Sequence, residues 1–106
     1  MPPDNPFYMN KILIVEDDAG IRDSVSFALQ AESFEVCMAG DGMEGCERFQ
    51  QENPDLLLLD LQLPKRTGLD VLRLVRESSQ IPVVILSVKD SEADIVSALE
   101  LGADDY

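Results

Sequence analysis

The amino-acid sequence predicts a doubly wound α/β domain, in which helices cover both faces of a parallel β-sheet. Short apolar runs alternate with segments whose apolar residues recur at helical spacing, and no hairpin signal joins one run to the next. Three of the runs are apolar throughout, which is typical of strands that are buried on both faces of a sheet.

Composition limits the functions that the chain can serve. Its 106 residues suffice for one hydrophobic core, and its 45% apolar and 27% charged residues are ordinary for a globular domain. The formal net charge of −13 repels nucleic-acid phosphates and anionic lipids. We therefore expect this domain not to bind nucleic acid or a membrane surface directly, and to attract cations and basic protein surfaces.

Residues 1–10 are expected to form a flexible N-terminal extension, followed by the domain itself in residues 11–106. The extension contains three prolines and lacks the basic start and apolar stretch of a signal peptide. The two cysteines, Cys37 and Cys46, are too few for a disulfide framework, and the chain has no histidine to complete a zinc site. We expect reduced thiols in a cytoplasmic protein, since no apolar run approaches membrane-spanning length either.

The first half of the domain is predicted to contain two strands and two helices. Lys11–Val15 is an apolar run typical of a buried strand, whereas residues 34–38 alternate between apolar and polar as an edge strand does. Asp18 is expected to cap the first helix, and Asp41 with Glu44 resembles a capping box for the second. The apolar residues expected to face the core from these helices are Ile21, Val25, Ala28, Leu29, Met43, Cys46 and Phe49.

The third strand and helix are expected to follow a break at Pro54. Residues 56–59 form a second fully apolar run, and residues 64–68 are predicted to be a loop. Thr67 and Asp70 are spaced to cap the helix that follows this loop. Its expected core-facing residues are Leu69, Leu72 and Val75.

The last elements are a fourth strand, a fourth helix and the start of a fifth strand. Val83–Leu86 is the third fully apolar run. The helix is expected to begin at Asp90 or Ser91 and to end at Gly102, because glycine is favoured just past the last helical turn. Residues 103–106 then begin the fifth strand. The residues expected to face inward from the fourth helix are Ile95, Val96 and Leu99.

Acidic residues follow two of the apolar strands. Glu16 and Asp17 come directly after the first strand, and Asp60 follows the third. Sites in open parallel sheets lie outside the carboxyl ends of the strands, near the point where the strand order reverses. If the first and third strands are neighbours, these carboxylates meet at one edge of the sheet, with Ser87 following the fourth strand.

Such a cluster favours a metal site. Neighbouring carboxylates raise one another's pKa unless a cation neutralises them, and acidic oxygen coordination suits Mg²⁺. A cation there also stabilises the charge that develops when a phosphoryl group moves onto a carboxylate, which yields an aspartyl phosphate. Taken singly, Asp17 and Asp60 are explained as well by helix capping or a solvated loop. Taken together, they favour phosphoryl chemistry.

Four motifs resemble those of response regulator receiver domains, the switch modules of two-component signalling. Residues 11–18 (KILIVEDD) are similar to the family's first strand and acidic pair, and residues 54–64 (PDLLLLDLQLP) to its phosphoacceptor strand and loop. Residues 81–87 (IPVVILS) are similar to its fourth strand with the hydroxyl residue, and residues 101–106 (LGADDY) to the start of its fifth strand. The motifs occur in order and cover nearly all of residues 11–106.

The resemblance implies a flavodoxin-like strand order of 2-1-3-4-5 and a phosphoacceptor site. Asp60 would accept a phosphoryl group from a sensor histidine kinase, in a reaction that needs Mg²⁺ or Mn²⁺. Asp17 would bind the metal directly and Glu16 would bind it through water. Asp60 and the backbone carbonyl of Gln62 would complete the protein's share of the ligands.

Phosphorylation would act through two further residues that the resemblance implies. Ser87 would contact the phosphoryl group, and Tyr106 would be the switch aromatic whose ring position is coupled to Ser87. The output would be exerted by a further domain of the parent protein, a DNA-binding domain that regulates transcription. The receiver would then be a phosphoacceptor that takes part in its own phosphoryl transfer and not an enzyme in its own right.

The sequence departs from the family's pattern after Tyr106. Receiver domains carry a lysine a few residues beyond the switch aromatic, followed by a last helix, and this chain ends before both. We therefore expect an incomplete or missing fifth strand and last helix, no catalytic lysine, and impaired phosphorylation of the 106-residue fragment. The open apolar sheet face is expected to drive dimerisation or a swapped oligomer.

Three other functions remain open from the residues alone. A small phosphohydrolase with an aspartate nucleophile usually has a second aspartate two positions later, where this chain has Gln62. A flavin or nucleotide carrier requires a phosphate-binding loop after the first strand, where this chain has the acidic residues 16–18. The third alternative is a receiver-like interaction or assembly domain that is not phosphorylated.

Overall fold

The computed structural model describes residues 10–61, 63, 67–86, 96, 99–100 and 102–103. Within these residues, four strands form one parallel sheet in the order β2-β1-β3-β4. The strands are β1 (Lys11–Val15), β2 (Glu35–Ala39), β3 (Leu56–Asp60) and β4 (Val83–Leu86). This order confirms the predicted 2-1-3-4-5 arrangement as far as the described residues extend, and they contain neither a fifth strand nor a last helix.

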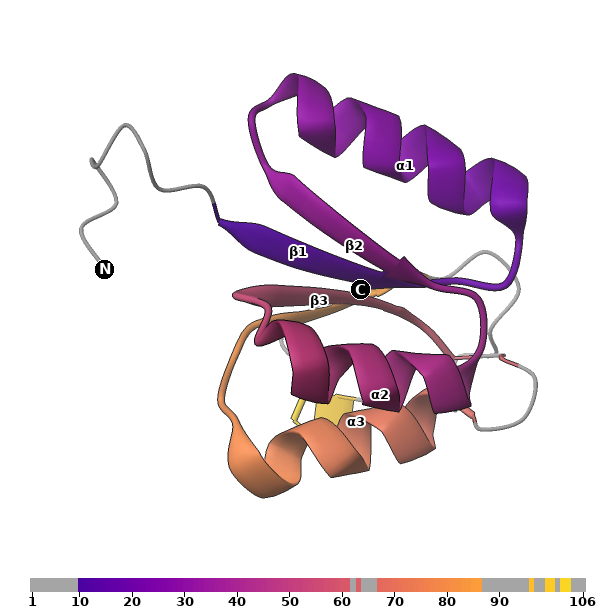
Figure 1. Cartoon of the computed structure of the whole chain (residues 1–106). Coiled ribbons are helices and arrows are strands. Elements are labelled where there is room, and N and C mark those ends of the chain that lie inside the picture. Colours follow the sequence, from indigo (N-terminus) through magenta and orange to yellow (C-terminus); the bar gives the residue numbers. More distant parts are fainter. Residues whose placement is uncertain are drawn as a thin grey trace.

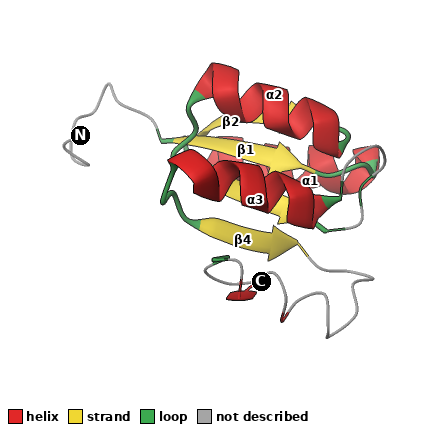
Figure 2. Ribbon diagram, turned by 90° about the horizontal axis from the view of Figure 1, so that it is seen from below, coloured by secondary structure: helices red, strands yellow, loops and turns green. Residues whose placement is uncertain are grey.

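Three helices cover the two faces of this sheet. Helix α1 (Ala19–Ala31) lies on one face, above the sheet in Figure 1, whereas α2 (Gly42–Glu52) and α3 (Gly68–Ser78) lie on the other. Seen from below in Figure 2, α2 and α3 pack side by side in front of the strands, with β4 at the edge. The predicted doubly wound α/β class is therefore confirmed.

Each helix begins at the cap that the sequence predicts. The side chains of Asp18, Asp41 and Thr67 each accept a hydrogen bond from the backbone N–H three positions later, at 3.0, 2.8 and 3.2 Å. In the second of these caps, Glu44 reaches back to the N–H of Gly40, at 2.7 Å, so the capping box closes one residue before its predicted position. These bonds satisfy backbone donors that have no partner within the helix.

The second strand begins one residue later than predicted, because the backbone N–H of Phe34 bonds to the last turn of α1. The N–H groups of Ser33 and Phe34 donate to the carbonyls of Gln30 and Leu29, and Ser33 has a φ of 71°. This left-handed residue and the two bonds close the helix, as is typical of helix C-termini. The second strand is therefore Glu35–Ala39 and not residues 34–38 as predicted.

The core lies between the sheet and the α2–α3 layer. On β1, Leu13 and Val15 belong to this cluster, whereas the buried residues Ile12 and Ile14 alternate with them along the strand. Cys46 and Phe49 are buried as predicted, each 8% exposed. The other buried members of the cluster are Ala39, Leu57, Leu59, Leu61, Val71, Leu72, Val75, Val83, Ile85 and Ala103.

Four residues predicted to face the core are exposed instead, namely Ala28, Met43, Val96 and Leu99. Met43, Val96 and Leu99 have exposed fractions of 48%, 46% and 38%. Met43 lies in the first turn of α2, and the described sheet ends at β4. Helical spacing identifies a face, but a neighbouring element must cover that face before its side chains are buried.

Gly102 ends a helical segment as predicted. It has a φ of 111°, and its N–H donates to the carbonyl of Leu99 at 3.1 Å. The predicted extension lies outside the described residues except for Asn10, and so do Asp90, Ser91, Ile95 and residues 104–106. Among the helices that are described, none has the length and apolar character needed to cross a membrane. Cys37 and Cys46 form no disulfide.

Candidate metal centre

The pairing of β1 with β3 places two acidic residues side by side. Val15 is aligned with Leu59, so the next residues, Glu16 and Asp60, lie next to each other at the carboxyl edge of the sheet. Asp17 follows on the loop that leads to α1. One carboxylate oxygen from each of Glu16, Asp17 and Asp60 lies within 4.8 Å of the other two. The three carboxylates that the sequence singled out therefore form one cluster.

The three acids differ in their access to solvent. Asp17 is exposed, Asp60 is half-buried, and Glu16 is only 3% exposed. Burial raises the pKa of Glu16 from 4.5 to about 7, with a further contribution from a hydrogen bond shared with Asp60. The backbone N–H of Asp18 opposes this shift by donating to the Glu16 carboxylate at 3.2 Å. Without a cation, the cluster thus favours retention of a proton on Glu16.

The start of α3 supports the segment that carries Asp60. The N–H of Gly68 donates to the carbonyl of Leu61 at 2.9 Å. A Cβ atom at Gly68 would overlap the Asp60 carbonyl oxygen and the Cα of Leu61. Glycine at this position lets the helix pack directly on the backbone at the end of β3, which fixes the direction in which the chain leaves Asp60.

The donor set fits a hard divalent cation. All three converging side chains are carboxylates, and neither nitrogen nor sulfur contributes to the described cluster. Mg²⁺ and Mn²⁺ prefer such oxygen ligands, and Mg²⁺ usually retains several waters beside one or two carboxylates. A cation at this edge would also offset the mutual repulsion that raises carboxylate pKa values. The residues therefore fit the metal that the sequence predicts.

Three of the predicted site residues lie outside the described residues. They are Gln62, Ser87 and Tyr106, so the structure neither brings them to the cluster nor separates them from it. One contact at the site was not predicted from the sequence. The Nη1 of Arg22 donates to the backbone carbonyl of Glu16 at 2.9 Å. A basic residue in the first turns of a helix that follows an acidic loop was the available signal for this contact.

Comparison with known proteins assigns the family. Residues 12–106 match the family model described as the response regulator receiver domain. The chain belongs to this family. Receiver domains are phosphoacceptor switch domains of two-component signalling and not conventional enzymes, which agrees with an acidic cluster at the end of β3 and β1.

Relatives of this receiver domain include longer proteins. The sensory transduction protein RegX3 of Mycolicibacterium smegmatis is 44% identical over 98 residues, which are 92% of this chain and 43% of RegX3. The receiver domain thus spans less than half the length of that relative.

Solved structures give the same fold. The BeF3-activated N-terminal receiver domain of Klebsiella pneumoniae RstA is 36% identical, with a TM-score of 0.85 over 92% of this chain and 83% of that one. The Mn²⁺-bound form of the response regulator Rcp1 is 33% identical, with a TM-score of 0.82 over 92% of this chain and 78% of that one.

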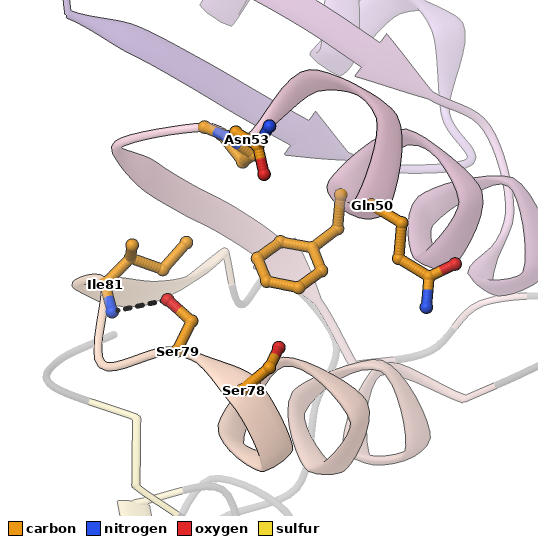
Figure 3. Close-up of a pocket in the computed structure, with 7 residues that line it drawn as sticks. Gln50, Asn53, Ser78, Ser79 and Ile81 are labelled. Carbon is orange, nitrogen blue, oxygen red and sulfur yellow. Dashed lines mark hydrogen bonds between the residues drawn. The ribbon is translucent and has the colours of Figure 1, made fainter.

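A hollow in the receiver domain lies at the end of the sheet opposite to the acidic cluster. It opens between the carboxyl ends of α2 and α3, where Figure 3 shows Gln50, Asn53 and Ser78 around it and the N–H of Ile81 bonded to the Ser79 hydroxyl at 3.1 Å. Phe49 and Pro54 complete its lining, and none of the lining side chains is ionisable. This hollow therefore lacks the charged groups that phosphoryl chemistry requires.

Proposed function

We propose that this receiver domain accepts a phosphoryl group on Asp60 from a sensor histidine kinase, in a reaction that depends on Mg²⁺ or Mn²⁺. The observation that supports it most is the convergence of carboxylate oxygens from Glu16, Asp17 and Asp60 within 4.8 Å, at the carboxyl edge of the sheet. Two similar structures support the same chemistry, since RstA was solved as a BeF3-activated receiver domain and Rcp1 with Mn²⁺ bound.

The proposed transfer needs no separate base. An ionised Asp60 oxygen attacks the phosphorus of the kinase phosphohistidine, the new O–P bond forms, and the N–P bond breaks with the electron pair leaving on the imidazole nitrogen. The bound cation supplies charge stabilisation for the transferring oxygens. Asp17 would hold it directly and Glu16 through water, with Asp60 and the Gln62 carbonyl as the remaining protein ligands.

The proposed switch extends from the site to the output. Ser87 and Tyr106 are the residues assigned to it by resemblance, and a longer parent protein would carry a DNA-binding output domain that regulates transcription. In this proposal residues 11–106 are the receiver and residues 1–10 an extension, and the protein acts in the cytoplasm. The net charge of −13 supports an output exerted by another domain, because the receiver's own field repels nucleic acid.

The family assignment sets aside the phosphohydrolase and the nucleotide carrier, because one family model spans residues 12–106. The receiver that binds partners without phosphorylation is separated from our proposal by experiment. We would add beryllofluoride to the chain with and without Mg²⁺ and follow thermal unfolding.

The proposal predicts a rise in melting temperature that requires both reagents and that Asp60→Asn abolishes. Asp23→Asn, at an exposed position of α1, is the matched control and should respond like the wild type. The same measurement on a version extended by the lysine and last helix typical of receiver domains tests the effect of those elements. A failure of both versions to respond would favour the unphosphorylated alternative.

A further inference from the structure

Both backbone polar groups of Glu16 are hydrogen-bonded. Its N–H donates to the carbonyl of Ala39 at the end of β2, at 3.1 Å. Its carbonyl accepts from the Nη1 of Arg22 on α1, at 2.9 Å. Glu16 is the residue at which β1 leaves the sheet, so these two bonds fix the point from which the acidic loop starts.

Arg22 lies at a position where a positively charged side chain does not stabilise the helix. Its N–H makes the first hydrogen bond of α1, to the carbonyl of Asp18 at 2.9 Å, so it lies close to the helix N-terminus. Positive side chains are disfavoured there by the helix dipole. The half-buried guanidinium turns back onto the acidic loop instead, where it makes its bond to Glu16.

The space for this guanidinium depends on Gly40, the residue that follows β2. A Cβ atom built on Gly40 would lie 3.2 Å from the Nη1 of Arg22 and 3.9 Å from the Oε1 of Glu44. The backbone of Gly40 is itself held, because its N–H donates to that Oε1 at 2.7 Å. A side chain at position 40 would therefore press on the nitrogen that bonds to Glu16.

We infer that Arg22 is a positioning residue for the divalent-cation site of this receiver domain. By holding the Glu16 carbonyl against the ends of β1 and β2, it keeps the Glu16 and Asp17 carboxylates directed toward Asp60 before the cation arrives. The inference rests on the proposed function, since it assigns a support to the same site. Removing groups that orient metal ligands typically lowers metal affinity by about 10- to 100-fold.

The first test compares Mg²⁺ affinities by titration calorimetry on the full chain. Arg22→Ala is expected to weaken Mg²⁺ binding by roughly tenfold, the lower end of that range. Arg22→Lys retains one charged donor and should recover most of the affinity. Asp55→Ala is the control for simple destabilisation, because Asp55 accepts from the Lys11 N–H at 2.8 Å at the far end of the sheet. It should lower the melting temperature and leave Mg²⁺ affinity unchanged.

A second variant tests the same contact without removing the charge. Gly40→Ala should weaken Mg²⁺ binding in the presence of Arg22 and have no effect in the Arg22→Ala background, because the pressed nitrogen is then gone. Folded Arg22→Ala with wild-type affinity, or an equal effect of Gly40→Ala in both backgrounds, would overturn the inference. If Arg22→Ala does not fold, two other proteins test the inference. Gly40→Ala should weaken Mg²⁺ binding, and Arg22→Lys combined with Gly40→Ala should relieve that loss of affinity. A wild type that binds no Mg²⁺ would overturn the proposed function itself.

Discussion

At the scale of single residues, Glu16 determines how the acidic cluster behaves without a cation. It is 3% exposed, and its pKa is raised to about 7 by burial and by the hydrogen bond shared with Asp60. Because its pKa is raised, ionising this carboxyl group costs more free energy in the folded chain than in the unfolded chain. A cation beside the cluster would offset this cost, because an opposite charge favours the ionised carboxylate.

We expect the metal-free chain to lose stability as the pH rises from about 4.5 to about 7. Glu16 has a folded pKa of about 7 and an ordinary value of 4.5, so between these values the folded state holds a proton that the unfolded state has released. Stability falls with pH wherever the folded state binds more protons. Thermal unfolding in EDTA should show this fall in the difference between wild type and Glu16→Gln. A difference that is constant across the range would contradict the shift.

Asp60→Asn should stabilise the metal-free chain at neutral pH. The substitution removes a negative charge from the cluster of three converging carboxyl groups, and the gain should be on the order of 1 kcal/mol, the free energy of about one pKa unit of interaction. Chemical denaturation of the metal-free proteins measures it, with Asp23→Asn as the exposed control. If Asp60→Asn is instead less stable than the wild type, Asp60 contributes to the fold and repulsion does not dominate.

At the scale of elements, the site depends on how α3 meets the end of β3. Gly68 bonds to the carbonyl of Leu61 at 2.9 Å, and a Cβ atom there would overlap the Asp60 backbone. The first turn of the helix and the end of β3 are therefore packed without an intervening side chain. A larger residue has to move one of the two backbones.

Gly68→Ala is expected to destabilise the domain by about 1–3 kcal/mol, because an added methyl group in a closely packed place shifts backbone. Gly20→Ala on α1 is the matched control. There the nearest atom to an added Cβ is the Asp18 Oδ1 at 3.2 Å, and a movement of this side-chain atom by a few tenths of an ångström relieves the contact while it keeps its cap bond to the Ile21 N–H. Urea unfolding of both variants should show a loss at position 68 only, and equal losses would contradict the backbone contact.

Elements were predictable from the sequence where one local pattern determined them. β1 and β4 have the predicted bounds because residues 12–15 of β1 and all of β4 form uninterrupted apolar runs. Phe34 was assigned to a strand because its bond to the end of α1 depends on the left-handed Ser33, which no periodicity reveals. The bond from Arg22 to Glu16 was missed for a similar reason, since it depends on the path of the loop between them.

At the scale of the whole molecule, the strand order brings residues of separate sequence motifs together in one site. The sequence places acidic residues after two strands, but only the pairing of β1 with β3 makes Glu16 and Asp60 neighbours. Periodicity does not give this order, and it was available beforehand through the family resemblance alone. The contributions of Gln62, Ser87 and Tyr106 stay predictions, as does the self-association expected from the sequence, which light scattering would measure.

Mg²⁺ should stabilise the wild type more than a sodium salt of equal ionic strength does. A ligand that binds the folded state alone adds about 2.7 kcal/mol at a concentration one hundred times its Kd. The net charge of −13 means that any salt relieves some repulsion, so the matched sodium series is essential. The additional gain with Mg²⁺ should be largely absent in Asp60→Asn. An equal gain in both proteins would place the cation away from the cluster.

The most direct test of the central claim is the site of phosphorylation itself. The chain, and a version extended by the lysine and last helix typical of receiver domains, would be incubated with acetyl phosphate and Mg²⁺ and examined by intact and tandem mass spectrometry. We predict the addition of one phosphoryl group that requires Mg²⁺, maps to Asp60, is lost in Asp60→Asn and is retained in Asp23→Asn. A phosphoryl group on another residue, or none on either version, would contradict the assignment of Asp60 as the phosphoacceptor.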